Sequence, residues 1–251
     1  MRLIYFMMIL IMFVFVSIVL SQSVSDLLAK ANGKYDADNF QGNFDLLKEV
    51  EKRDPENIEV IWRLARAHFD FSDNTDEESV IEVNIYTGFE YAKRALEKDN
   101  THPKSHKWYG ILIGRVGEIE GTEQKIKNSY KVAEHTLIAI ELDPEDGGNY
   151  HVMGRWHYTL ADLSWIERKI ASWVYATPPE ASFEEARDYF KQAFEKTPDE
   201  IRNYLWLGKT LIELDDKEGA GEAFKQALNI PVTTESDRIL QKEAGELLDD
   251  L

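Results

Sequence analysis

The stretch NYLWLGKTLIELDDKEGAGEAFKQALNIP, residues 203–231, places small and bulky residues at fixed intervals in two amphipathic segments. Counting its tyrosine as position 4 puts Gly208 at position 8, Ala220 at position 20 and Phe224 at position 24. Small residues let two helices cross closely, and large ones fill the space around the crossing. The DDKEG segment suits the turn between the helices, and Pro231 ends the second one. The stretch therefore predicts one antiparallel helix pair.

Related units precede this pair. The residues at position 8 are Ala65, Gly110, Gly154 and Gly208, and the alanines at position 27 are Ala95, Ala139, Ala193 and Ala227. A more degenerate unit begins at Leu27. This is the spacing of tetratricopeptide (TPR) repeats, in which each helix pair needs neighbours to bury its apolar face. We predict an all-α, right-handed superhelical array of about five TPR-like pairs over Val24–Pro231, with insertions and a closing C-terminal helix.

Three units are longer than the last one. Position 8 and position 27 are 19 residues apart between Gly208 and Ala227, but 30, 29 and 39 residues apart in the three preceding units. Insertions in repeat arrays map to one face and often carry function. For the two shorter insertions, simple lengthening of the helices is an equally good interpretation.

Composition excludes several classes of protein. The chain has 251 residues, no cysteine, and 46 acidic against 29 basic residues, for a net charge of −17. The absence of cysteine excludes disulfides, thiol catalysis and Cys-ligated zinc. The negative charge opposes nucleic acid unless basic residues are gathered locally. No motif of an enzyme, cofactor site or metal site is present, so we predict a non-enzymatic protein with no cofactor.

The first 23 residues form a separate hydrophobic segment, and we assign residues 24–251 to the helical domain. The segment carries no charge from Leu3 to Leu20, a length of about 27 Å as a helix, close to a bilayer core. Two interpretations compete, a membrane anchor and a cleaved signal peptide. No Asn-X-Ser/Thr sequon occurs in the chain, which favours a membrane-anchored, cytosol-facing domain over a secreted or luminal one.

Several segments resemble one known family, the regulators of microtubule dynamics. They are IWRLARA (61–67), GFEYAKRALE (88–97), HKWYG (106–110), IELDPED (140–146), GRWHY (154–158), LSWIERKIAS (163–172) and TPP (177–179). The resemblance runs from about Leu27 to the C-terminus. It implies a TPR-like protein that associates with microtubules and spindle poles. It also implies that some relatives are anchored to mitochondrial or endoplasmic reticulum membranes, where their TPR domain is implicated in phospholipid binding.

A stripe on the first helix of each pair, at positions 2, 5, 9 and 12, is expected to line the concave groove. Six of its sixteen residues are Lys or Arg and one is acidic, the reverse of the whole chain. This favours a basic groove for an acidic protein partner such as tubulin, or for a phosphate-bearing lipid headgroup. In the alternative, acids on adjacent helices neutralise these bases. The predicted groove residues are Trp62, Arg66, Phe69, Lys104, Lys107, His151, Arg155, Tyr158, Arg202 and Lys209.

The longest insertion contains LSWIERKIASWVYATPP, which puts apolar residues along one helix face. We favour packing of this face over an open end of the array; the alternative is a lipid-facing helix. Its candidate lipid-facing residues are Trp165, Ile166, Ile170, Trp173 and Val174.

Overall fold

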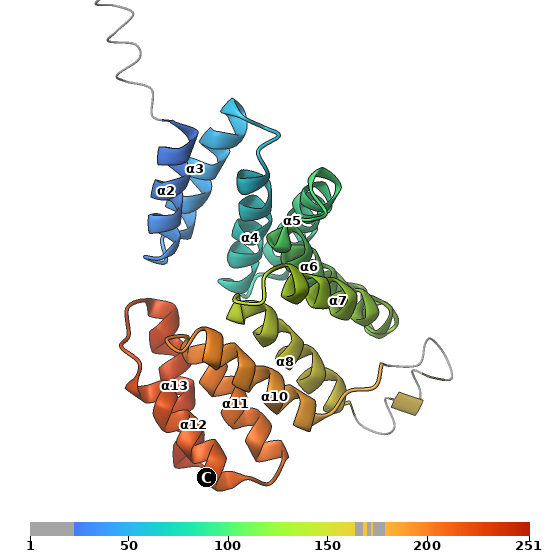
Figure 1. Ribbon diagram of the computed structural model, residues 1–251, viewed down its shortest axis with the longest axis vertical. Coiled ribbons are helices and arrows are strands. Elements are labelled where there is room, and N and C mark those ends of the chain that lie inside the picture. The colour runs from blue at the N-terminus through green and yellow to red at the C-terminus, as the bar shows by residue number, and fades with distance from the viewer. Residues whose placement is uncertain (1–22, 164–167, 170–171, 173–178) are drawn as a thin grey trace, which may run out of the picture.

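The computed structural model describes residues 23–163, 168–169, 172 and 179–251 (Figure 1). Within these residues the chain forms eleven α-helices and no β-strand. The helices are α2 (Val24–Tyr35), α3 (Phe40–Arg53), α4 (Ile58–Asp73), α5 (Glu78–Lys98), α6 (Pro103–Glu120), α7 (Thr122–Leu142), α8 (Gly147–Ala161), α10 (Phe183–Lys196), α11 (Ile201–Glu213), α12 (Lys217–Asn229) and α13 (Glu235–Asp249). They pack as the pairs α2–α3, α4–α5, α6–α7, α8–α10 and α11–α12, with α13 closing the array. The prediction of five helix pairs and a closing helix is confirmed.

Side-chain size at positions 8 and 24 is complementary within each pair. A Cβ atom at Gly208 in α11 would lie 2.3 Å from the ring of Phe224 in α12. Gly154 in α8 has the same relation to Phe190 in α10, at 2.6 Å. Such distances leave no room for a side chain, so a phenylalanine at position 24 requires a glycine at position 8. In two other pairs a residue smaller than phenylalanine stands at position 24: Thr136 opposite Gly110, and Ala92 opposite Ala65.

Buried polar residues at position 3 join three of the pairs to the pair before them. The amide of Asn203 donates to the carbonyl of Thr197, 3.3 Å away, just after α10. In the same way Asn149 donates to the last turn of α7 at 3.1 Å, and Ser105 to the last turn of α5 at 3.2 Å. The carbonyls of Ala95 and Ala139 already accept from the backbone N–H groups of Asp99 and Asp143, so these side chains add a second hydrogen bond that ties the next pair to the helix end. The sequence analysis did not identify this role.

The two shorter insertions lengthen helices. α5 and α7 each have 21 residues and α6 has 18, whereas α11 and α12 have 13 each. The interpretation of these insertions as extra helical turns is therefore the correct one. The longest insertion lies between α8 and α10, and part of it falls outside the described residues.

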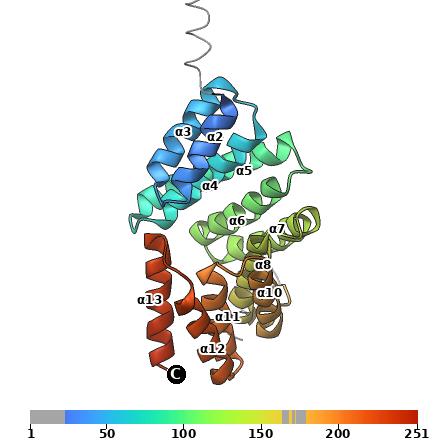
Figure 2. The same cartoon turned by 60° about the vertical axis from the view of Figure 1, so that its left-hand side comes forward.

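The first and last parts of the array meet. Figures 1 and 2 both show the start of α13 close to the ends of α2 and α3. Asp38, in the turn between those two helices, accepts a hydrogen bond of 3.0 Å from the backbone N–H of Ser236 in the first turn of α13. Asp38 has a positive φ of 52°, and its carboxylate stands at the positive end of the α13 dipole. This hydrogen bond joins the first helix pair to the closing helix.

Buried apolar side chains form two clusters, one in α2–α6 and one built mainly from α10–α13. Among the described residues, no helix has the length and apolar character needed to cross a bilayer. The predicted anchor or signal segment is almost wholly outside that part of the chain, since its residues 1–22 are not described.

Candidate functional site

The predicted groove residues lie on the first helices α4, α6, α8 and α11. Contacts between α4 and α6 and between α8 and α11 place these helices side by side. His151 in α8 hydrogen-bonds through Nδ1 to the side-chain oxygen of Asn203 in α11, 2.9 Å away. Burial holds the pKa of His151 well below its usual value, and the nearby Arg202 and Arg155 act in the same direction. His151 is therefore a neutral element of this wall.

Two of the predicted cations are neutralised at the start of α8. The ammonium of Lys107 lies 2.9 Å from the carboxylate of Asp146, and Lys104 pairs with the same carboxylate. Asp146 also caps α8 by accepting a hydrogen bond from Gly148 N–H at 3.0 Å. Burial opposes ionisation of Asp146, yet the two ammonium groups hold its pKa at about 2. These lysines are structural partners of one carboxylate within the chain.

Two further cations also have partners. Lys209 pairs with Glu243 of α13, and Arg202 pairs with Glu200 at 2.9 Å. The single acid of the stripe, Glu59, is itself neutralised. Its hydrogen bond with His102 and its ion pair with Arg63 lower its pKa to about 2.

Arg66 in α4 differs from these four. Its guanidinium lies over the ring of Tyr35, with Cζ 3.5 Å from the ring centroid. Its Nε and Nη2 atoms are buried and have no hydrogen-bond partner among the described residues. A stacked guanidinium is held in place by the ring, while its in-plane donors remain unpaired.

Asp70, one helical turn beyond Arg66, is also buried without a partner. Its side chain shows no ion pair with Arg66 among the described residues, and its Oδ2 makes no hydrogen bond there. Burial raises the pKa of Asp70 to about 7, although the positive charge of Arg66 acts in the opposite direction. Near neutral pH this carboxyl group is divided between its charged and uncharged forms.

Arg155 in α8 is the second predicted groove cation without an ion pair among the described residues. Its Cζ lies 3.7 Å from the ring centroid of Trp206, and Lys209 approaches the same ring at 4.4 Å. Arg155 is exposed to solvent. Tyr158 packs edge-on against Trp206 at 5.3 Å, so one tryptophan organises this part of the wall.

The other aromatic residues predicted for the groove lie mostly in the core. Trp62 is only 7% exposed and belongs to the N-terminal buried cluster. Phe69 is half-buried against Trp108. The residues that organise the two free guanidinium groups, Tyr35 and Trp206, were missed. Trp206 stands at position 6, outside the stripe considered, and Tyr35 belongs to the degenerate first unit.

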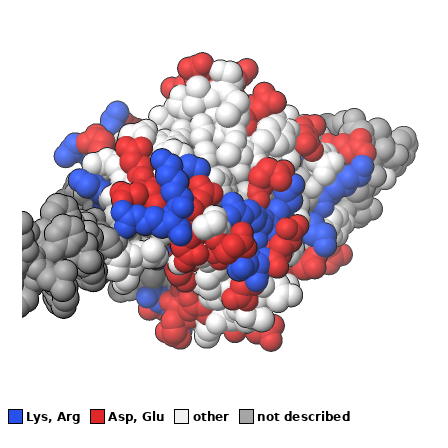
Figure 3. All heavy atoms as spheres, turned by 90° about the horizontal axis from the view of Figure 1, so that it is seen from above, with Lys and Arg blue, Asp and Glu red and all other residues white. Residues whose placement is uncertain are grey.

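The surface of the array mixes both charges. Figure 3 shows Lys and Arg interleaved with Asp and Glu on the face that it presents. This agrees with the neutralisation of four of the six predicted groove cations by intramolecular acids. Of the six predicted groove cations, only Arg66 and Arg155 have no ion pair among the described residues.

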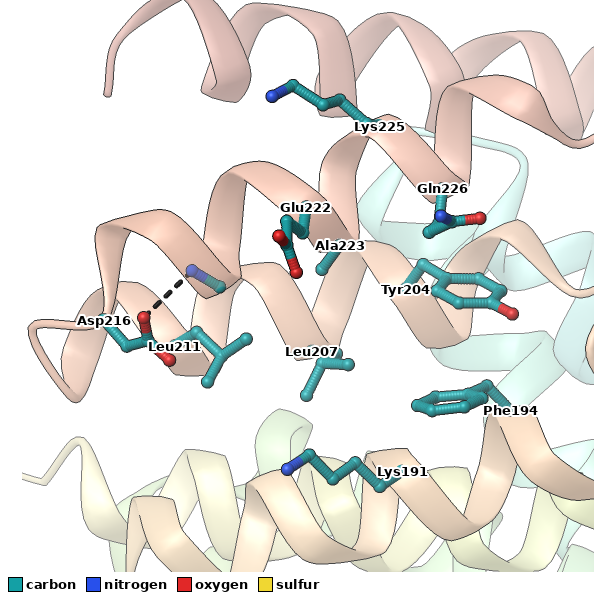
Figure 4. A pocket seen from close by; sticks show the side chains of 11 residues that line it. Lys191, Phe194, Tyr204, Leu207, Leu211, Asp216, Glu222, Ala223, Lys225 and Gln226 are labelled. Atoms are coloured by element: carbon teal, nitrogen blue, oxygen red, sulfur yellow. Dashed lines mark hydrogen bonds between the residues drawn. The ribbon is translucent and has the colours of Figure 1, made fainter.

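A hollow lies between the second helices α10 and α12, over α11 (Figure 4). Its volume is about 570 Å³. Phe194 and Tyr204 stack at its side with ring centroids 5.1 Å apart, and Lys191 and Lys225 reach it from the two flanking helices. None of the predicted groove residues lines this hollow.

The candidate lipid-facing residues Trp165, Ile166, Ile170, Trp173 and Val174 all lie outside the described residues. Within the described part of the chain no cluster of three or more metal-ligating side chains occurs. His106 hydrogen-bonds instead to His135, with 2.9 Å between their Nδ1 atoms, and to the carbonyl of Asn100.

These stacked helix pairs define a TPR-like α-helical array. Solved structures agree on the fold. A TPR protein of Thermus thermophilus superposes with a TM-score of 0.68 at 13% identity, covering 90% of this chain and 99% of that one. Pseudomonas aeruginosa PilF superposes with a TM-score of 0.55, also at 13% identity, covering 90% of this chain and 85% of that one.

The chain belongs to the regulator of microtubule dynamics family, because residues 27–251 match the family described as regulator of microtubule dynamics protein 1-3. It is 40% identical over 228 residues to regulator of microtubule dynamics protein 1 of Mus musculus, covering 90% of this chain and 74% of that one. It is 33% identical over 237 residues to regulator of microtubule dynamics protein 2 of Homo sapiens, covering 93% of this chain and 56% of that one. Family and fold identify a non-enzymatic regulator or adaptor.

Proposed function

We propose that this chain is an adaptor that binds an acidic segment of a protein partner in the microtubule system through its concave face. The names of its relatives support a partner connected with microtubules. The surface of a microtubule is strongly acidic, so a chain with a net charge of −17 needs locally available cations to approach it. Lys104, Lys107, Arg202 and Lys209 are already occupied by intramolecular acids.

The observation that carries the proposal is the pair of stacked guanidinium groups, Arg66 over Tyr35 and Arg155 over Trp206. Neither makes an ion pair within the described residues, and both are held at fixed positions by aromatic rings. Guanidinium groups that are oriented but not neutralised are suited to recognition of carboxylates.

Microtubule co-sedimentation of the full chain tests this proposal. Arg66→Gln combined with Arg155→Gln is expected to weaken binding by at least about tenfold, with each charged hydrogen bond accounting for roughly that factor. Binding of the unaltered chain should also weaken steeply as salt rises. Unchanged affinity of the double variant would exclude the concave face as the binding site.

Arg187→Gln provides a matched control. Arg187 lies on the second helix α10 and pairs with the neighbouring Asp188 at 2.8 Å, so the same charge is removed away from the concave face. The proposal also requires the helical array to face the cytosol. Protease added to intact membranes should digest the array without detergent, and protection until detergent is added would exclude a role on microtubules.

A further inference from the structure

The unpartnered atoms of Arg66 form one particular edge of its guanidinium. Nε and Nη2 lie side by side, and both are buried without a hydrogen-bond partner among the described residues. Their two N–H bonds point in parallel, which matches the two oxygens of a carboxylate. Tyr35 covers the face of the group at 3.5 Å and leaves this edge unused.

The chain has a buried acid on the same helix but does not pair it with Arg66. Asp70 lies one turn further along α4, and its Oδ2 is also buried without a partner among the described residues. A buried charge without a partner destabilises the conformation that contains it. The observed conformation therefore leaves a recognition group unsatisfied in a place where a carboxylate from outside the chain would satisfy it.

The closing helix α13 contacts the chain beside Tyr35. The backbone N–H of Asp38 donates to the carbonyl of Tyr35 at 3.0 Å, and the carboxylate of Asp38 accepts from the backbone N–H of Ser236 in α13. The hydrogen bond between Asp38 and Ser236 closes the array on the same side. One hydrogen bond between half-exposed groups contributes little to stability, so this contact can open while the helices stay folded.

We propose that the observed conformation is a closed state, and that parting of the Asp38–Ser236 contact uncovers the Nε–Nη2 edge of Arg66 as the anchoring point for a carboxylate of an acidic peptide. The inference rests on the proposed function and specifies the chemistry at its binding site. The Asp38–Ser236 contact then limits access to Arg66. The paired Nε–H and Nη2–H donors of Arg66, which form a fork, bind the two oxygens of the carboxylate.

Binding of a fluorescent, glutamate-rich dodecapeptide to the full chain, followed by anisotropy, tests the fork. Arg66→Lys keeps the charge but loses the paired donors, so it should weaken binding by about tenfold, nearly as much as Arg66→Gln. Arg187→Lys on α10 is the matched control and should bind as the unaltered chain does. Equal binding by Arg66→Lys and the unaltered chain would overturn the fork.

The absence of cysteine from the chain permits a clean test of the closing contact. Asp38→Cys combined with Ser236→Cys should form a disulfide that holds the array closed. The oxidised variant should lose most peptide binding, and reduction should restore it to at least the level of the unaltered chain. Equal affinity of the oxidised and reduced forms would overturn the closed-state assignment. The two single-cysteine variants control for effects of the substitutions themselves.

The outcomes separate this inference from the function on which it rests. If Arg66→Lys binds normally while the Arg66→Gln and Arg155→Gln pair does not, the concave site stands and the fork is wrong. If the unaltered chain binds neither microtubules nor the peptide, both fail. Amidation of the peptide C-terminus identifies the carboxylate: loss of binding assigns the anchor to a chain terminus, and unchanged binding assigns it to glutamate side chains.

Discussion

Two parts of the array place a cation near an acid, and only one of them forms an ion pair. At the start of α8, Lys107 and Lys104 converge on Asp146, which also caps the helix. In α4, Arg66 stacks on Tyr35 while Asp70 remains unpaired one turn away. The first arrangement holds the array together. The second leaves charge available, so a count of basic residues alone cannot locate a binding site.

The largest effect that distinguishes the two regions is expected from Asp146→Ala. The change leaves Lys107, whose side chain is only 15% exposed, without its carboxylate and removes the N-cap of α8. Breaking a buried pair and a cap together should lower the free energy of unfolding by about 3 to 5 kcal/mol. Urea denaturation measures this loss. A loss below about 1 kcal/mol would mean that the pair is not structural. The control is Asp143→Ala, since Asp143 lies 3.9 Å from Lys104 and does not cap α8.

The next effect is the pH dependence of stability that comes from Asp70. Because the pKa of Asp70 is raised to about 7 in the folded chain, the folded state keeps a proton that the unfolded state loses above about pH 4. Stability contributed by this group is therefore full below the unfolded pKa and falls as pH rises toward 7, by up to about 1.4 kcal/mol per pH unit.

Asp70→Asn should remove this component. The difference in unfolding free energy between the variant and the unaltered chain should grow from pH 5 to pH 7 in favour of the variant. Parallel curves from urea denaturation across that range would show that Asp70 ionises normally. His151, whose pKa is lowered by burial, acts in the other direction and loses its contribution as pH falls below about 6.5.

Arg66→Met is expected to change stability by less than about 1 kcal/mol. Methionine removes the unpaired buried donors and keeps apolar contact with Tyr35, so the lost cation–π attraction is largely offset. Thermal and urea unfolding measure the effect. A loss near that expected for Asp146→Ala would show that Arg66 has a structural partner and would remove the contrast between the two regions.

The smallest effect is expected from Lys107→Gln on binding of the glutamate-rich peptide. Because Asp146 already occupies this ammonium, affinity should change by less than about twofold, whereas Arg155→Gln should weaken binding several-fold. Anisotropy titrations of the two variants side by side measure the difference. A larger loss for Lys107→Gln would restore the wider basic groove expected from the sequence.

Repeat spacing was sufficient to predict the helix pairs. Glycine at position 8, alanine at position 27 and proline at the repeat ends report on local packing, and local packing is what a repeat pattern encodes. The same pattern placed Arg66, Lys107 and Arg155 on one stripe of the first helices. It could not show whether the two shorter insertions were loops or extra helical turns, because the spacing from position 8 to position 27 gives only the length of each insertion.

The partners of the stripe residues depend on distant contacts. Asp146 is 39 residues from Lys107, and Tyr35 meets Arg66 from a unit that matches the repeat only loosely. Neither contact follows from the spacing within one repeat. The meeting of Asp38 with Ser236 across 198 residues depends on the curvature of the whole array, which accumulates from the packing of every pair.

The division of the apolar interior into two clusters affects how the chain moves. The α2–α6 cluster and the cluster built mainly from α10–α13 have no buried residue in common. Each should protect its amides as a separate cooperative block in hydrogen exchange, with intermediate protection in α7 and α8 between them. A substitution inside one cluster is therefore expected to lower amide protection in its own block more than in the other.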